Sequence, residues 1–190
     1  SSNSVTASSV YGNAGNDTIA LGDSLSTVSA TTFAGGQGND FIGGATTVND
    51  TFSTTGNALS GATFTQTDIE GGNGNDTIHL LGLATYSALN VNSNVGNDKV
   101  RFEEATLLNS VVGMGQGNDE FSGGATLIET ATLAGGKGND TIIVSATNFE
   151  SFIVGGDRAN ADNIDGDGND SIAIIGGTTF SAGSIYGGGG

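Results

Sequence analysis

The stretch Glu70–Gly82, EGGNGNDTIHLLG, decides the fold of this chain, because close copies of it recur along the sequence. Ala134–Val144 reads AGGKGNDTIIV, and the tripeptide Gly-Asn-Asp occurs seven times, with its Asp residues separated by 23, 36, 22, 21, 21 and 30 positions. Self-similarity at a period of about 20 to 50 residues is typical of a solenoid, in which each repeat forms one coil that stacks on the next. The seven residues are Asp17, Asp40, Asp76, Asp98, Asp119, Asp140 and Asp170.

Apolar residues recur at fixed distances from these Asp residues, and their neighbours are mostly Ser, Thr or Ala. This period of two is typical of β-strands with one buried face. The apolar positions lie two after the Asp (Ile19, Ile42, Ile78, Val100, Phe121, Ile142, Ile172), seven before it (Val10, Phe33, Ile69, Val91, Val112, Leu133) and twelve before it (Val28, Phe64, Tyr86, Leu107, with Leu127 one place out of register). We predict an all-β fold, a right-handed parallel β-roll or β-solenoid of about eight coils with roughly 21 residues each. Each coil is expected to hold two short strands, joined by a Gly-rich turn on one side and a looser corner on the other.

Two longer intervals interrupt the period. We interpret residues 41–63 as a degenerate, shortened coil, because Asn49-Asp50 remains there while the glycines are lost. We interpret residues 155–170 as a doubled turn, in which GGDRAN is followed by DGDGND. The whole chain, 1–190, is then a single solenoid.

Composition excludes several classes of partner. The chain has 190 residues with 34 Gly, no Pro and no Cys, and its 20 Asp and Glu against 4 Lys and Arg give a net charge of −16. Such a surface repels nucleic acid and anionic lipid, and no apolar run reaches the ~18 residues of a membrane span. We therefore expect neither nucleic acid binding nor direct membrane insertion. A disordered acidic linker is the alternative for this composition, and the regular repeat argues against it.

The segment GGxGNDxΦx, where Φ is apolar, resembles the nonapeptide of the repeats-in-toxin family of calcium-binding β-rolls. The resemblance covers nearly the whole chain, and it implies that Ca²⁺ binds between the turns of successive coils. The chemistry agrees, because Ca²⁺ prefers hard oxygens, which Asp carboxylates and the carbonyls of a glycine turn supply. We expect a single row of about six ions, because the motif occupies one side of each coil. The candidate ligands are the seven Asp residues above with Gly12, Gly15, Gly35, Gly38, Gly71, Gly74, Gly135, Gly138, Asp165, Asp167 and Gly168.

Some turns depart from the family pattern. The turn before Asp98 reads SNVGND, and the one before Asp119 reads MGQGND, so these sites are expected to be weaker or altered. The doubled turn offers Asp157 and Asp162 as further ligands. A calcium-free ladder of Gly-Asn-Asp turns is the alternative to a metal row.

No catalytic arrangement accompanies the repeat. His79 is the only histidine and is expected on the outer face of a strand, and the sequence contains no Gly-x-Ser-x-Gly motif. We therefore predict that the chain is not an enzyme.

A column of hydroxyl residues lies thirteen positions before the Asp, at Thr27, Thr63, Thr85 and Thr106, and Ser29, Thr65 and Ser87 follow two positions later. A flat Thr/Ser ladder can bind an ordered surface such as ice. Ordinary β-propensity on a wet face is the stronger interpretation, and Leu108 interrupts the second column.

Within the repeats-in-toxin family the composition is most similar to bacterial surface-layer or filament proteins. This resemblance implies a secreted or cell-surface structural protein, with type I secretion and folding on calcium outside the cell; a C-terminal folding module of a secreted enzyme or toxin is the alternative. The last residues, SIYGGGG, place Ile185 in an apolar column and Gly187–Gly190 in the first four turn positions. We therefore expect further repeats, or self-association by end-to-end stacking of copies.

Overall fold

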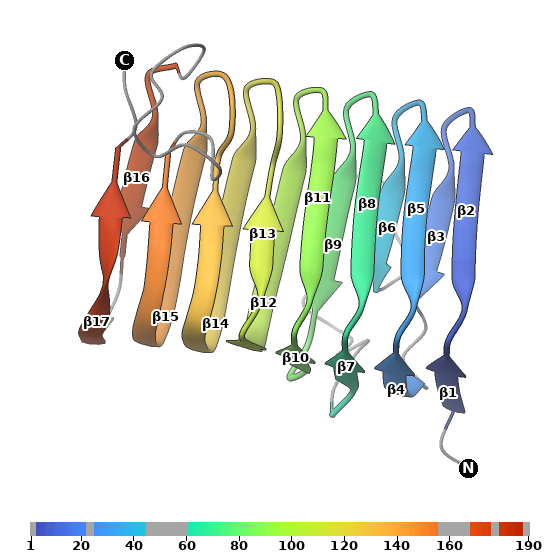
Figure 1. The fold of residues 1–190 in the computed structure, drawn as a ribbon, viewed down its shortest axis with the longest axis horizontal. Coiled ribbons are helices and arrows are strands. Elements are labelled where there is room, and N and C mark those ends of the chain that lie inside the picture. Colours follow the sequence, from blue (N-terminus) through green and yellow to red (C-terminus); the bar gives the residue numbers. More distant parts are fainter. Residues whose placement is uncertain (1–2, 22–24, 45–60, 156–167, 176–178, 188–190) are drawn as a thin grey trace.

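Period-two strands and repeated turns build a parallel β-solenoid (Figure 1). The computed structural model describes residues 3–21, 25–44, 61–155, 168–175 and 179–187. Within these ranges every regular element is a strand, so no helix there is long and apolar enough to cross a membrane. The solenoid makes about six turns, about 22 residues apart, which confirms the predicted fold class.

Each coil contributes strands to three faces, which we name by their relation to the Gly turn. The base face carries β1 (Asn3–Thr6), β4 (Leu25–Ser29), β7 (Thr63–Thr65) and β10 (Thr85–Ser87). The leading face enters the turn through β2 (Ser9–Ala14), β5 (Thr32–Gln37), β8 (Asp68–Asn73), β11 (Asn90–Val95) and β13 (Val111–Gly113). The trailing face leaves it through β3 (Thr18–Leu21), β6 (Phe41–Gly44) and β9 (Thr77–Leu81). Figure 1 shows the leading strands in front, the trailing strands behind and the base strands below.

In the C-terminal half, longer strands run around the corners between faces. These are β12 (Lys99–Leu108), β14 (Glu120–Ala134), β15 (Thr141–Val154) and β17 (Thr179–Tyr186), whereas β16 (Ser171–Ile174) is a short trailing strand. Equivalent residues remain paired in parallel from coil to coil; Val100, for example, pairs with Ile78 on one side and Phe121 on the other. Like residues therefore stack on like along the solenoid axis, at the strand spacing of about 4.8 Å.

The three predicted apolar columns form the core. Ile78, Ile69 and Phe64, one from each column, are fully buried. Aromatic rings stack within the core, with the centroids of Phe64 and Tyr86 4.8 Å apart. In the column twelve residues before the Asp, the buried residue is Ile128, which pairs with Leu107. The prediction of Leu127 for this column was wrong by one position.

Each coil has three strand faces rather than the two strands expected. The base and leading faces meet at the residue ten before each Asp, whose left-handed backbone turns the chain, and β14 continues through this corner at Thr130. Glycine does not mark this corner, which is why the sequence pattern missed it. Six described coils share this conformation, with φ between 47° and 53°, at Ala7, Ala30, Gln66, Ala88, Asn109 and Thr130.

The expected eight coils were an overcount. Strands β4, β5 and β6 pair directly with β7, β8 and β9, so no layer separates them. The predicted degenerate coil, 41–63, therefore contains the end of one coil and the start of the next, and its middle, 45–60, lies outside the described residues. The 36 positions from Asp40 to Asp76 therefore separate two directly adjacent coils.

The close stacking of turns makes the glycine two residues before each Asp difficult to replace. Gly74 has φ +127°, and a Cβ there would overlap the carbonyl O of Gly38 in the preceding coil. Gly15 has φ +115° but nothing within 4 Å of the same position. Both Gly→Ala changes carry the left-handed penalty of about 1–2 kcal/mol, and only Gly74→Ala adds the overlap.

We predict that Gly74→Ala lowers the midpoint of thermal unfolding clearly more than Gly15→Ala does, measured by circular dichroism under one buffer condition. Equal losses in the two variants would contradict the stacking described here.

Candidate metal centre

The turn that carries the Gly-Asn-Asp motif has two left-handed positions. The residue two before the Asp is Gly in each described turn, and in the six turns from Gly15 to Gly138 its φ lies between 115° and 148°. The residue four before it is Gly or Asn, the residue types that tolerate this conformation best. Asn94 takes this position with φ 73°, so SNVGND keeps the turn shape despite losing a glycine.

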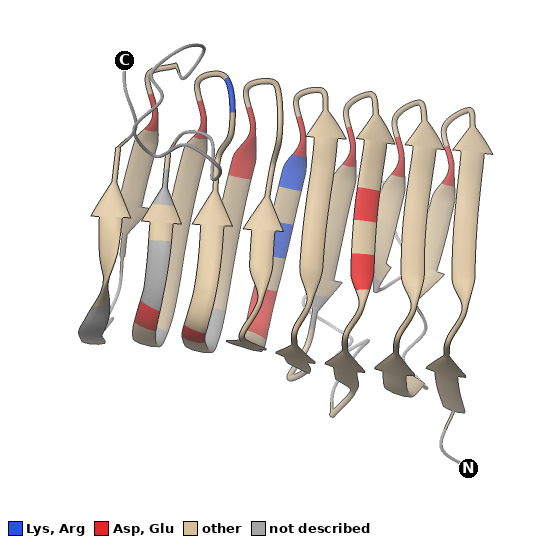
Figure 2. Ribbon diagram, viewed as in Figure 1, with Lys and Arg blue, Asp and Glu red and all other residues tan. Residues whose placement is uncertain are grey.

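The Asp residues form a hydrogen-bonded ladder along the turn edge, which we call the Asp ladder. The backbone N–H of each Asp donates to Oδ1 of the Asp in the following coil, over 2.7–2.9 Å. All seven predicted Asp residues belong to it, and Figure 2 shows an acidic position recurring at the turn edge of successive coils. The rungs run from Asp17 through Asp40, Asp76, Asp98, Asp119 and Asp140 to Asp170.

The neighbouring Asn residues form a second ladder of opposite direction. The N–H of Asn39 donates to Oδ1 of Asn16 in the preceding coil over 2.9 Å, and the same contact repeats up to Asn169, which donates to Asn139 over 2.7 Å. The Asn side chains are exposed, whereas the Asp side chains turn inward. The pair Asn-Asp therefore ties each turn to both neighbouring turns.

The inward Asp carboxylates are almost completely buried. Asp40, Asp76, Asp98 and Asp119 are between 1% and 3% exposed. In these four and in Asp17, Oδ2 has no hydrogen-bond partner, and no Lys or Arg pairs with them in the part of the chain that the structure describes. A buried charge without a partner is strongly unfavourable, so this row requires either protons or cations.

In the turns of Asp17, Asp40, Asp76 and Asp140, the Oδ2 atom lies beside the glycine five residues before the Asp. A Cβ on Gly71 would lie 2.6 Å from Asp76 Oδ2 and 2.8 Å from the carbonyl O of Ser93 in the next coil. Gly12, Gly35 and Gly135 have the same two kinds of neighbour. The missing Cβ thus leaves room where a carboxylate oxygen and a backbone carbonyl of the next coil approach one another.

Two turns fill this room with a side chain. Ser93 and Met114 replace the glycine before Asp98 and Asp119, and both side chains are buried. The Ser93 hydroxyl donates to the carbonyl of Met114 over 2.6 Å. These are the two turns whose sequences depart from the family pattern. In both, a buried side chain stands where the other turns have glycine.

Burial raises the pKa of the central carboxyls. The pKa of Asp76 rises from 3.8 to about 7 because of burial, opposed by the N–H of Asp40 and reinforced by the charges of Asp98 and Asp40. Asp119 behaves alike, with a pKa of about 7. Burial raises the pKa of Asp98 only to about 6, because the N–H of Asp76 and the polar Ser93 side chain favour its charged form. Without a cation, Asp76 and Asp119 therefore hold protons below about pH 7 and lose them above it.

The doubled turn is described only at its two ends. Gly155 takes the place of the glycine beside Asp170, because its Cβ would lie 2.6 Å from Asp170 Oδ2 and 2.6 Å from the carbonyl O of Gly187. The N–H of Gly168 donates to the carbonyl O of Gly138 over 3.0 Å. Asp170 is therefore the rung after Asp140, while the remaining predicted ligands, Asp157, Asp162, Asp165 and Asp167, lie outside the described residues.

The donors available to a cation are hard oxygens. Among the described residues, no group of three or more His, Cys, Asp or Glu side chains could hold a metal ion, and Oδ1 of each rung from Asp40 to Asp170 already accepts an N–H. Carboxylate Oδ2 and backbone carbonyls remain, which is a donor set of the type that Ca²⁺ prefers and transition metals do not. The residues fit Ca²⁺ in chemistry and in charge.

His79 lies apart from the row, half-buried on β9, where it pairs with Arg101. Burial, with a smaller contribution from the Arg101 charge, lowers its pKa to about 4, so it is neutral at physiological pH. No family model, curated relative or solved structure matches this chain, so the turn geometry alone supports the assignment of the site.

We predict that, in metal-free buffer, the folded chain loses stability as pH rises from about 4 to about 7. The folded state keeps protons on Asp76 and Asp119 up to pH 7, whereas the unfolded chain releases them near 3.8, so deprotonation favours unfolding. The β signal in circular dichroism, followed by thermal melting at each pH, measures this. Stability that increases over the same pH range would contradict the buried, protonated row.

Proposed function

We propose that the chain is a calcium-binding structural solenoid of an extracellular surface, such as a surface layer, a filament or an adhesin stalk. The observation that carries the proposal is the row of buried Asp carboxylates whose Oδ2 atoms have no partner. Coil stacking repeats this charge about every 4.8 Å, and like charges at such a distance repel. A divalent cation from solution relieves both the burial and the repulsion.

Calcium suits the row better than other cations do. The exposed and buried donors at the turns are oxygens, and about six to eight oxygens at flexible angles satisfy Ca²⁺. The likeness of the turn to the repeats-in-toxin nonapeptide supports the same ion. The residues that would hold it are the Asp ladder members with the carbonyls of Gly35, Gly71, Gly155 and their equivalents. The bound ion would supply positive charge that links one coil to the next.

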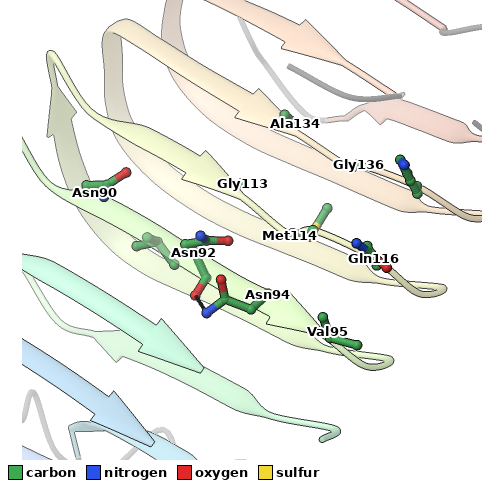
Figure 3. Close-up of a pocket in the computed structure, with 12 residues that line it drawn as sticks. Asn90, Asn92, Asn94, Val95, Gly113, Met114, Gln116, Ala134 and Gly136 are labelled. Atoms are coloured by element: carbon green, nitrogen blue, oxygen red, sulfur yellow. Dashed lines mark hydrogen bonds between the residues drawn. The ribbon is translucent and has the colours of Figure 1, made fainter. Parts of the chain in front are cut away.

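A structural role is supported by the character of the described surface. A hollow of about 470 Å³ crosses the leading face where Gly113 and Ala134 leave room (Figure 3). Its polar lining consists mainly of amide groups, Asn90, Asn92, Asn94 and Gln116. Such groups bind by hydrogen bonding and do not serve as nucleophiles or general bases. We infer that the chain is not an enzyme.

Self-association is part of the proposal. Val10 and Tyr11 on β2 are 39% and 60% exposed, and Ile185 and Tyr186 on β17 are 44% and 46% exposed. Val10 and Ile185 belong to the column that is buried in the middle of the solenoid, as at Ile69. These open edges would bind a further coil, from adjoining repeats or from a second copy.

The proposed location is outside the cell, where calcium is abundant. In a low-calcium cytosol the deprotonated row would oppose folding, which would keep the chain unfolded for type I secretion. An ion that binds only the folded state then stabilises it by mass action.

We expect Ca²⁺ added at pH 7.5 to metal-depleted protein to increase the β signal and raise the unfolding temperature, with Mg²⁺ much less effective because of its stricter geometry. Circular dichroism and calorimetric titration measure this. If neither calcium nor chelator changes the β signal or the melting temperature, the proposal is wrong.

The variant Asp76→Asn separates calcium from protons. Asn keeps an Oδ1 acceptor for the Asp40 N–H but removes the buried charge. We predict that it is more stable than the parent in metal-free buffer at pH 7.5 and less stable in calcium, by melting temperature. Glu70→Gln, which removes an exposed charge from the same coil, is the control and should show no such reversal. Stabilisation by Asp76→Asn under both conditions would identify a calcium-free ladder.

A further inference from the structure

The base face presents hydroxyl groups in two parallel ranks. The first rank consists of Ser4, Thr27, Thr63, Thr85 and Thr106, which are paired in sequence from coil to coil. The second consists of Thr6, Ser29, Thr65 and Ser87, with Leu108 in the fifth place. Ser4 and Thr6 extend the predicted columns by one coil. We call these nine residues the hydroxyl array.

All nine side chains point outward and are free. Each is exposed or partly exposed, whereas the residues between the ranks, such as Val28, Phe64 and Tyr86, are fully buried. In the part of the chain that the structure describes, none of the nine hydroxyls forms a hydrogen bond with another protein group. The array is therefore a set of unused donors and acceptors on a rigid, well-packed support.

The hydroxyl array carries no charge, and neither do several other strands of a chain in which 13% of the residues are charged. Further along the same base face, the outward positions include Glu129 and Glu150. Figure 2 shows the contrast, since β1, β4, β7 and β10 bear no acidic or basic residue whereas acidic positions appear at the base of β14 and β15.

The spacing of the array is close to that of ordered water. Hydroxyls in one rank repeat at the strand spacing of about 4.8 Å, and the two ranks are two residues apart, about 6.7 Å. Water molecules joined tetrahedrally by O–H···O bonds of about 2.75 Å place second neighbours about 4.5 Å apart and repeat every ~7.3 Å across their layers. The mismatch is about 0.6 Å between the ranks and about 0.3 Å per coil along a rank, which adds to about 1.2 Å over the four intervals of the first rank, and side-chain rotation must absorb it.

We propose that the hydroxyl array binds the surface of ice. The hydroxyls would take the places of lattice oxygens, and the threonine methyl groups would fill the space between them. A charged side chain would hold its own water shell out of register with the lattice, so the neutrality of the array favours adsorption. The proposal is independent of calcium as ligand, and requires only that the solenoid is folded.

The test is adsorption of the labelled whole chain to a single ice crystal grown slowly from a buffer in which its β signal is intact. We expect the parent to be enriched on the ice and to slow recrystallisation of fine-grained ice. Thr63→Lys, at the exposed middle of the first rank, should lose both effects. Thr85→Lys in the next coil serves as a second variant if the first one melts early.

The matched control is Thr32→Lys on the leading face, where Thr32 is also partly exposed and pairs with Asp68. It should adsorb as the parent does. Exclusion of the parent protein from ice, or undiminished adsorption of the folded Thr63→Lys and Thr85→Lys variants, would overturn the proposal. Loss of adsorption in Thr32→Lys as well would also overturn it, since binding would then depend on net charge rather than on the array.

Discussion

The structure depends on one constraint, the burial of a row of carboxylates at the spacing of β-strands. Parallel stacking places each Asp directly over the next, and the turn directs its Oδ2 inward, beside a glycine that leaves room for it. Hydrogen bonds from backbone N–H groups satisfy Oδ1 but leave the charge of the carboxylate uncompensated. Closing the turn edge therefore requires that the carboxylates are neutralised, by protons below about pH 7 and, in our proposal, by cations above it.

The two ladders at this edge have different tasks. The exposed Asn ladder points back along the stack and is neutral, so it aligns the turns under any conditions. The N–H groups of the buried Asp ladder donate to the following coil, and its carboxyls titrate, so its contribution to stability changes with pH and, in our proposal, with cations. Together they explain why the tripeptide, rather than Asp alone, is repeated. The core beneath them is assembled from ordinary apolar columns and would not by itself depend on solution conditions.

Much of the architecture could be predicted from the sequence because every coil repeats the same signals. The apolar columns, the one-sided turn and the stacked Asp residues all follow from counting positions from Gly-Asn-Asp. The third strand could not be predicted, because the corner at Ala7, Gln66 and Thr130 adopts a left-handed backbone without glycine. The number of coils was overestimated because strand pairing across residues 45–60 depends on tertiary contacts that the local pattern does not contain. The opposite directions of the ladders likewise depend on side-chain rotamers that spacing does not determine.

The most direct test of the central claim is anomalous diffraction from crystals of the chain grown in calcium. The account predicts peaks in a single row along the turn edge, each within coordination distance of an Oδ2 of the Asp ladder, about 2.3–2.6 Å. A calcium-saturated crystal with no peak along this row, and with Oδ2 of Asp40, Asp76 and Asp98 still unpartnered, would contradict it.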